Sequence, residues 1–366
     1  MKIKFTFIIL ILILLPAKDS YCEKPGISAQ SAILIDAKSK RVLASYNPYI
    51  KLPIASTTKI MTALVALGKG ELTDKVEIDN RSVGIEGSSI YLEKGEIITL
   101  EDLLYGLLLR SGNDSAMAIA NFLGEYQEKY VKMMNEEAKK IGAESTNFTN
   151  PHGLHQDKHY STAYDLALIT GEAMKIDKFK EIVSSKSWIA NRSKNSIFYN
   201  KNKALWEYEG GDGVKTGYTT KSGRCLVTTA TRDDTQLIAV VLNDNNWFND
   251  CYKLMDYGFE NFNTYVICEK EQFLKNIPIY NGKKDYISAI SKDTFLYPLR
   301  EEEIERIKIN MSLPETIEAP VIKGEKIGDI IIYLDGQIIH KGEIISKENV
   351  EKLSIIRNFF KKIRNQ

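Results

Sequence analysis

The chain has 366 residues, of which 43% are hydrophobic and 27% are charged, and its formal net charge at pH 7 is +1. Because the charge is almost balanced and the basic residues cluster only at the C-terminal end, we expect no binding to nucleic acid. The cysteines are too few for a disulfide framework. We interpret Cys225, Cys251 and Cys268 as small buried hydrophobic residues rather than metal ligands or nucleophiles.

The N-terminal segment has the features of a secretory signal peptide. Lys2 and Lys4 precede a largely apolar run from Phe5 to Leu15, and a cleavage site is expected near Cys22. A membrane-spanning helix needs roughly 20 apolar residues, which is more than this run offers. We therefore predict that residues 1–22 are a signal peptide and that the protein is exported. The remainder is longer than one hydrophobic core usually serves, which predicts two domains.

The first elements after the signal are a hairpin and a helix. Ser31 to Tyr46 contains two short β-rich runs separated by a polar turn, which predicts a β-hairpin. Thr57 to Leu67 is rich in apolar helix formers and ends before Gly68, which predicts a helix with a glycine stop. Ser56 is therefore expected at the N-terminus of a helix.

The middle of the chain predicts helices and then strands. Two strongly apolar helical stretches are separated by the polar turn Ser111-Gly112-Asn113-Asp114. Strands, helices and again strands favour a mixed α/β (α+β) fold, an antiparallel sheet flanked by helices. The predicted helices are 100–109, 115–123, 126–141 and 163–174, and the later strands are 225–231 and 236–242.

The C-terminal part changes character. From Phe273 to Ile345 the chain consists of short Ile-, Tyr- and Val-rich segments with turns at Asn281-Gly282, Lys323-Gly324 and Asp335-Gly336. We predict a first domain over residues 23–266, which contains the motifs described below, and a small all-β domain over residues 267–346.

The last residues, 347–366, predict an amphipathic helix. Apolar residues recur every three or four positions, and cations flank them. Such a segment suits the surface of an anionic membrane, although a helix packed on the β domain is the alternative. The apolar positions are Val350, Leu353, Ile356, Phe360 and Ile363, and the cations are Lys352, Arg357, Lys361, Lys362 and Arg364.

The motif Ser56-Thr57-Thr58-Lys59 occurs once in the chain and combines a nucleophile with a base. Three-residue spacing on a helix places both side chains on one face. A serine needs a base to remove its proton, and a lysine serves as that base when burial or a neighbouring cation lowers its pKa. Taken alone, the tetrapeptide is weak evidence for a catalytic site, because one match to Ser-x-x-Lys is expected by chance in a chain of this length.

Two further motifs follow in order. Ser111-Gly112-Asn113 lies in the polar turn between two apolar helices, although Ser-x-Asn also occurs at Ser145 and Ser193. Lys215-Thr216-Gly217 is the only Lys-Thr-Gly, and we prefer Lys215 over Lys221 because residues 212–214 lead into it as a strand. The region from Lys215 to Thr219 offers a cation and hydroxyl groups for a carboxylate.

The ordered set of three motifs resembles that of serine penicillin-binding proteins and related β-lactamases. Residues 29–262 resemble the low-molecular-mass D-alanyl-D-alanine carboxypeptidases throughout, including the segments PIASTTKIMTALVAL, LLLRSGNDSAMAIA, TNFTNPHGL and GGDGVKTGYT. The resemblance implies a penicillin-binding transpeptidase fold, peptidoglycan stem peptides as substrate and β-lactams as covalent inhibitors. It also implies action at the outer face of the bacterial cytoplasmic membrane or in the cell wall.

The resemblance implies a role for each motif residue. Ser56 is the nucleophile, Lys59 accepts its proton, and Ser111 relays a proton. Asn113 holds the substrate amide, while Lys215 and Thr216, with Thr219 nearby, hold the terminal carboxylate. Gly217 lets the substrate lie against its strand, and the backbone N–H groups of Ser56 and Tyr218 form the oxyanion hole.

No metal or other cofactor is expected. His155 and His159 have a spacing that zinc sites use, but no glutamate stands between them as in HExxH, so we interpret His152, His155 and His159 as structural.

Three rival functions remain. A β-lactamase needs a positioned glutamate for deacylation, and no Glu-x-x-Leu-Asn occurs between Asn113 and Lys215. A catalytically silent wall-binding module is disfavoured because Ser56 and Lys59 are both present. A D,D-endopeptidase acting on cross-links uses the same residues, so the sequence does not separate it from a carboxypeptidase.

Overall fold

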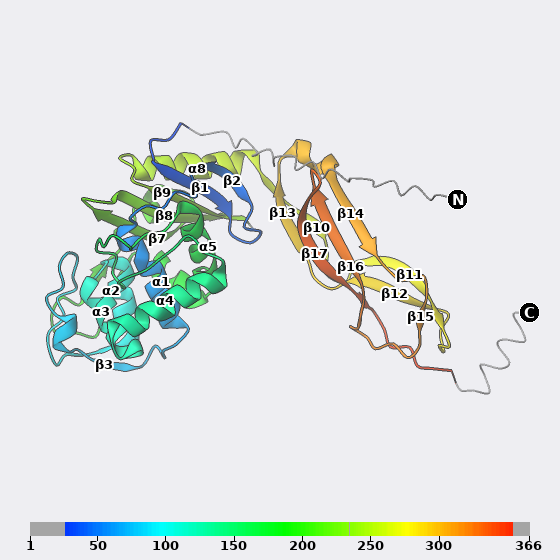
Figure 1. Ribbon diagram of the computed structural model, residues 1–366, viewed down its shortest axis with the longest axis horizontal. Coiled ribbons are helices and arrows are strands. Elements are labelled where there is room, and N and C mark those ends of the chain that lie inside the picture. The colour runs from blue at the N-terminus through cyan, green and yellow to red at the C-terminus, as the bar shows by residue number, and fades with distance from the viewer. Residues whose placement is uncertain (1–25, 234, 354–366) are drawn as a thin grey trace, which may run out of the picture.

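The computed structural model describes residues 26–233 and 235–353, which form a mixed domain followed by a β-rich domain (Figure 1). The first domain is built on a five-stranded antiparallel sheet in the order β2-β1-β9-β8-β7. The predicted hairpin 31–46 forms β1 and β2, and β1 also pairs with β9. The strands are β1 Ser31–Asp36, β2 Val42–Tyr46, β7 Gly211–Thr219, β8 Gly223–Arg232 and β9 Thr235–Leu242.

Both faces of this sheet are covered, which explains why all six residues of β1 are buried. Ile33 and Ile35 belong to the core on one face, and Ala32 and Leu34 belong to the core on the other. This division follows from the alternation of side chains along a strand. The helix α8, Trp247–Asn261, covers the second face, and sequence patterns did not predict it because its aromatic and charged residues mask the helical period.

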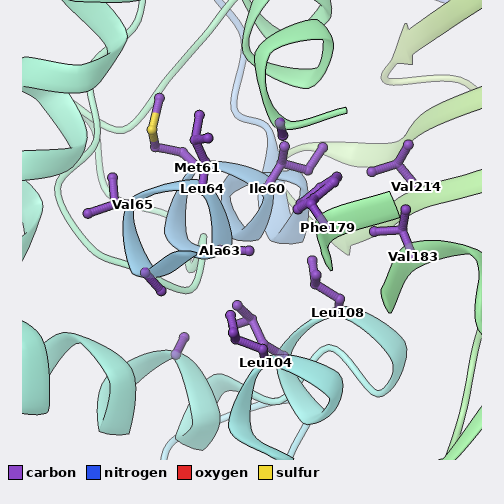
Figure 2. Packing of buried hydrophobic residues seen from close by; sticks show 14 of the residues in the cluster. Ile60, Met61, Ala63, Leu64, Val65, Leu104, Leu108, Phe179, Val183 and Val214 are labelled. Carbon is purple, nitrogen blue, oxygen red and sulfur yellow. The ribbon is translucent and has the colours of Figure 1, made fainter. Parts of the chain in front are cut away.

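The helices on the first face surround α1, Lys59–Leu67. Because α1 is apolar on all sides, it is buried along most of its length. Figure 2 shows its side chains packed near Leu104 and Leu108 of α2 and near Phe179 of α6. The other helices of this face are α2 Leu100–Leu109, α3 Asn113–Gly124, α4 Gln127–Ile141, α5 Ala163–Ala173 and α6 Asp177–Ser184. The short helix α7, Ala204–Glu207, precedes β7. Two small two-stranded sheets complete the domain, β3 Lys75–Glu77 with β4 Ile97–Thr99, and the hairpin β5 Ser187–Ile189 with β6 Ile197–Tyr199.

The second domain contains a six-stranded sheet in the order β14-β16-β17-β12-β11-β15 and a separate β10-β13 pair. Asn281, Gly324, Asp335 and Gly336 all have positive φ, as the predicted turns require. The strands are β10 Asn263–Cys268, β11 Phe273–Tyr280, β12 Tyr286–Ser291, β13 Phe295–Leu299, β14 Ile307–Ser312, β15 Ile317–Glu318, β16 Lys326–Leu334 and β17 Gln337–Ser346.

Two predicted boundaries differ from the structure. Residues 263–266, which we assigned to the catalytic domain, form the start of β10 and pair with β13. The predicted tail helix does not begin at residue 347, because Val350 is 2% exposed and pairs with Val321 in the β domain. Leu353 is still held there by its N–H, which donates to the Asn281 carbonyl at 2.8 Å. The rest of the predicted tail, like the predicted signal peptide, lies outside the described residues.

A partly buried charged contact joins the two domains. The guanidinium of Arg41, between β1 and β2, lies 2.5 Å from the Glu303 carboxylate and also donates to the Pro298 carbonyl. The same guanidinium lies 5.1 Å from the ring centroids of Phe262 and Tyr297. The contact therefore links the β1–β2 turn of the first domain to residues 298–303 of the second.

Candidate active site

Ser56 lies in a tight turn rather than in the helix itself. The chain forms a 3-10 turn over Ala55–Thr58 immediately before α1. The hydroxyl of Thr57 donates to the Ile54 carbonyl at 2.6 Å, and the hydroxyl of Thr58 donates to the Ala55 carbonyl at 2.8 Å. Ser56 is half-buried, so its hydroxyl stays accessible while its neighbours are fixed.

Two glycines allow other segments to approach this turn. A Cβ at Gly217 would lie 3.0 Å from the backbone nitrogen of Ser56, so a side chain there would crowd the strand β7 against the nucleophile. Gly153 has a φ of +90°, and a Cβ there would lie 1.9 Å from the Ala55 carbonyl oxygen. A side chain at position 153 would collide with the Ala55 carbonyl and one at position 217 would press on the Ser56 backbone, so glycine allows both segments to lie against the turn.

Lys59 is fully buried beside the nucleophile. Its Nζ lies 3.0 Å from Ser56 Oγ, 2.6 Å from Asn113 Oδ1 and 2.6 Å from the His152 carbonyl oxygen. Burial lowers the pKa of Lys59 well below its usual value, and the positive charge of Lys215 lowers it further, while Asp114 opposes the shift. A neutral amine at this position is able to accept the proton of Ser56.

The turn between α2 and α3 brings the second motif to the same place. Ser111 is buried with a φ of +65°, and Asn113 opens α3. The N–H of Asn113 donates to the Ser88 carbonyl at 2.7 Å, and its side-chain amide donates to the Glu86 carbonyl. With its Oδ1 on Lys59, Asn113 ties this turn to the nucleophile.

Asp114 holds the loop that follows Glu86. Its carboxylate is 1% exposed and accepts hydrogen bonds from the hydroxyl of Ser89 at 2.5 Å and from the N–H groups of Ile90 and Leu92 at 3.1 Å. This side chain is a positioning residue, since it acts on the cleft through the loop. No role was predicted for Asp114 from the sequence, although its place beside Asn113 was a usable signal.

The third motif lies on β7, the edge strand next to Ser56. Lys215 is 1% exposed, and its Nζ donates to the Thr216 carbonyl at 3.0 Å. Burial, and then the charge of Lys201, lower the pKa of Lys215 to about 7. Lys221, its rival in the sequence, is exposed in the β7–β8 turn, which favours Lys215.

The two other residues predicted on β7 differ in their surroundings. Tyr218 is 64% exposed, so its ring lies in solvent and its proposed contribution is from the backbone. The hydroxyl of Thr219 lies 2.9 Å from the hydroxyl of Ser222 and accepts a hydrogen bond from the Ser222 N–H. Thr219 therefore closes the β7–β8 turn as well as standing near the site.

The histidines have structural partners. Nδ1 of His159 accepts from the Thr149 N–H at 3.1 Å, so its Nε2 carries the proton and donates to Thr58 Oγ1 at 2.8 Å. Burial lowers the pKa of His152 to about 3 and that of His159 to about 4, which keeps both rings neutral. In the part of the chain that the structure describes, no three His, Cys, Asp or Glu side chains form a metal-binding group. His152 contributes its backbone carbonyl, which accepts a hydrogen bond from Lys59. No sequence signal indicated this contact.

Comparison with known proteins identifies the family. The family described as D-alanyl-D-alanine carboxypeptidase matches residues 18–246, more than half of the chain. The chain belongs to this family. The expected enzyme class, a penicillin-binding serine D-alanyl-D-alanine carboxypeptidase, is thereby confirmed. Residues 262–352 match the family described as the C-terminal domain of penicillin-binding protein 5, which confirms the β-rich second domain.

Individual relatives agree with this assignment. The D-alanyl-D-alanine carboxypeptidase DacF of Bacillus subtilis is 30% identical over 96% of this chain and 95% of its own length. DacC of Escherichia coli is 33% identical over 92% of this chain and 88% of its own. The crystal structure of penicillin-binding protein 5 from Haemophilus influenzae, 29% identical, superposes with a TM-score of 0.78 over 90% of this chain and 99% of that one. The predicted fold class is confirmed.

The three cysteines are buried, as expected for small hydrophobic residues. Cys225, Cys251 and Cys268 are free and buried. Burial raises the pKa of the Cys225 thiol to about 11, so it stays protonated and unreactive at neutral pH.

Proposed function

We propose that Ser56 and Lys59 are the nucleophile and base with which this enzyme removes the terminal D-alanine from peptidoglycan stem peptides. The observation that carries the proposal is the buried Lys59 Nζ at 3.0 Å from Ser56 Oγ. Ser56 Oγ attacks the carbonyl between the two D-alanines while its proton moves to Lys59. The C–N bond then breaks, the proton passes to the leaving amine, and D-alanine departs from an acyl-enzyme that water hydrolyses.

The remaining motif residues bind and orient the substrate in this proposal. Lys215 and Thr216 hold the terminal carboxylate, because a buried cation beside a hydroxyl is suited to that group. Asn113 holds the substrate amide, and Ser111 relays the proton to the leaving amine. The N–H groups of Ser56 and Tyr218 stabilise the developing oxyanion from the two sides of the cleft.

One assay separates the rival reactions. Purified peptidoglycan is incubated with the enzyme, and released D-alanine is compared with released products of cross-link cleavage. A carboxypeptidase releases D-alanine from pentapeptide stems, whereas cleavage of cross-linked dimers at a similar rate indicates an endopeptidase. Rapid turnover of the β-lactam nitrocefin would instead support the β-lactamase alternative, which the missing deacylation glutamate disfavours.

We expect Lys215→Ala to weaken acylation much more than folding, because the proposed partner of Lys215 is the substrate carboxylate. A charge-assisted contact is worth roughly 1.5–3 kcal/mol, so the acylation efficiency should fall by about ten- to a hundredfold. The measurements are the rate of labelling by fluorescent penicillin and the melting temperature. Lys221→Ala is the matched control, since Lys221 is exposed in the next turn. A Lys215→Ala protein that labels normally but melts early would show that Lys215 is structural.

We further propose that the protein is exported and lies on the outer face of the membrane through residues 354–366. The sequence supports this with the N-terminal signal-like segment and with the apolar and cationic residues near its end. In residues 26–233 and 235–353 no helix is both long and apolar enough to cross a bilayer. The β domain then serves to hold the catalytic domain away from the membrane.

A truncation after Leu353 tests the anchor without damaging the β domain, because Val350 and its pairing with Val321 stay intact. We expect the full-length mature protein to float with vesicles that contain phosphatidylglycerol and the truncated protein to stay in solution. Melting temperatures of the two forms serve as the control. Equal binding by both proteins, or binding by neither, would show that this segment is not the anchor.

A further inference from the structure

The small hairpin β5–β6 has an apolar outer face. Its cross-strand pairs are Ser187 with Tyr199, Trp188 with Phe198, and Ile189 with Ile197. Trp188 and Phe198 face the protein: the Trp188 indole donates to Asp102 at 2.7 Å, and Phe198 is 1% exposed. The opposite face carries Ile189, 74% exposed, Ile197, 51% exposed, and Tyr199, 61% exposed.

This arrangement is unusual for a hairpin with one solvated face, where polar residues normally point outward. Ile189 and Ile197 are directly paired, and Tyr199 follows two residues after Ile197 on the same face, so the three form one patch. Contiguous exposed apolar side chains mark interaction surfaces more often than isolated ones do. The patch is therefore a candidate binding surface.

The same segment is strongly basic. Residues 186–203 contain no aspartate or glutamate, and their cations are Lys186, Arg192, Lys194, Lys201 and Lys203. Arg192 is paired with Glu96, and Lys194 lies 3.4 Å from Glu93. Lys203 lies 3.7 Å from Glu207, and Lys201 has the hydroxyl of Ser88 at 3.5 Å as its hydrogen-bond partner. Among the described residues Lys186 and Lys201 have no carboxylate partner, and these two cations favour an occupant with negative charges.

The hairpin is continuous with the wall of the active site. The guanidinium of Arg192 donates to the carbonyl groups of Ile90 at 2.7 Å and Tyr91 at 3.0 Å. This is the loop that Asp114 also holds. At the other end of the hairpin, Lys201 reaches Ser88, whose carbonyl accepts from Asn113. The hairpin therefore contacts, at both of its ends, the loop that Asp114 holds beside Asn113.

We propose that the outer face of β5–β6 binds the peptidoglycan polymer next to the stem peptide being trimmed. This inference rests on the proposed function, because the cleft takes only the end of one stem. The polymer offers sugar rings with apolar faces and neighbouring stems with free carboxylates. The apolar faces of the sugars suit Tyr199 and the two isoleucines. The carboxylates of neighbouring stems suit the lysines that border these residues.

The test replaces the patch while keeping the strands. Ile189→Thr, Ile197→Thr and Tyr199→Thr are combined, because threonine has a high β propensity. The matched control is Ile309→Thr with Met311→Thr on β14, where both side chains are about half-exposed in the other domain. D-Alanine release is measured with isolated sacculi and with a short soluble pentapeptide. We expect the KM for sacculi to rise about tenfold in the patch variant, as the loss of buried apolar area predicts, with kcat/KM for the soluble peptide unchanged.

A second measurement keeps this inference separate from the proposed function. Sedimentation with sacculi is compared for Ser56→Ala proteins with and without the patch substitutions, which requires no catalysis. Weaker sedimentation of the patch variant supports the inference, and salt should weaken the binding of both proteins. Three results would overturn the inference. They are equal sedimentation of the two proteins, an equal loss of kcat/KM on the soluble peptide, or a patch variant that loses binding to anionic vesicles but not to sacculi. Failure of the unmodified enzyme to release D-alanine from either substrate would count against the proposed function alone.

Discussion

Replacing Ser56 with alanine is expected to abolish both D-alanine release and covalent labelling by fluorescent penicillin. The β-lactam amide mimics the scissile bond, so both reactions need the same hydroxyl. No other side chain takes its place, because the surrounding turn holds position 56 beside Lys59 and Gly217. The measurements are labelling on a gel and D-alanine release from a soluble pentapeptide.

The matched control is Ser185→Ala. The Ser185 hydroxyl donates to the Glu181 carbonyl at 2.6 Å, at the C-terminal end of α6. This protein should label like the unmodified enzyme, and both variants should melt within a few degrees of it. If the Ser56→Ala protein is labelled as fast as the unmodified enzyme, Ser56 is not the nucleophile.

Local sequence patterns predicted the elements of the site better than the contacts between them. The spacing of Ser56 and Lys59 was sufficient to place two side chains together, because a helical turn determines that distance. The contacts of Lys59 with Asn113 and His152 join residues 54 and 93 positions apart. The family resemblance placed Asn113 in the cleft, whereas the backbone carbonyl of His152 has no signal in a sequence.

The same limit explains the errors at the level of the fold. The hairpin 31–46 was predicted from its own residues, but the pairing of Ala32 with Val241 depends on tertiary packing. In the tail, the helical period that includes Val350 continues into residues outside the structure, while Val350 itself packs in the β domain. An apolar residue fits a helix face and a sheet core equally well, so periodicity does not separate them over a few residues.

The pH dependence of acylation follows from two buried lysines. Lys59 acts as a base only when neutral, and burial places its pKa well below the usual value, so the acylation rate should rise as pH rises through that lowered pKa. Lys215 binds a carboxylate only when protonated, and its pKa is about 7 in the free enzyme. The acylation efficiency should therefore fall again as the pH rises above the pKa of Lys215. The resulting pH profile is bell-shaped.

Lys59→Met should remove the rising limb of this profile together with most of the activity. Methionine is apolar and of similar length, so it fills the buried site without a charge. Loss of a general base typically costs about 10²–10⁴-fold in rate, and we expect acylation by fluorescent penicillin to fall within that range. The residual rate should no longer rise with pH through the lowered pKa of Lys59, because Lys215 alone remains to titrate.

Lys215→Ala provides the complementary control, since it should lose the falling limb and keep the rising one, which moves to higher pH because the charge of Lys215 lowers the pKa of Lys59. Melting temperatures of all three proteins separate these effects from unfolding, because Lys59 donates to Asn113 and His152 as well as to Ser56. Acylation of the Lys59→Met protein within tenfold of the unmodified enzyme, or with its rising limb intact, would mean that another group takes the proton from Ser56.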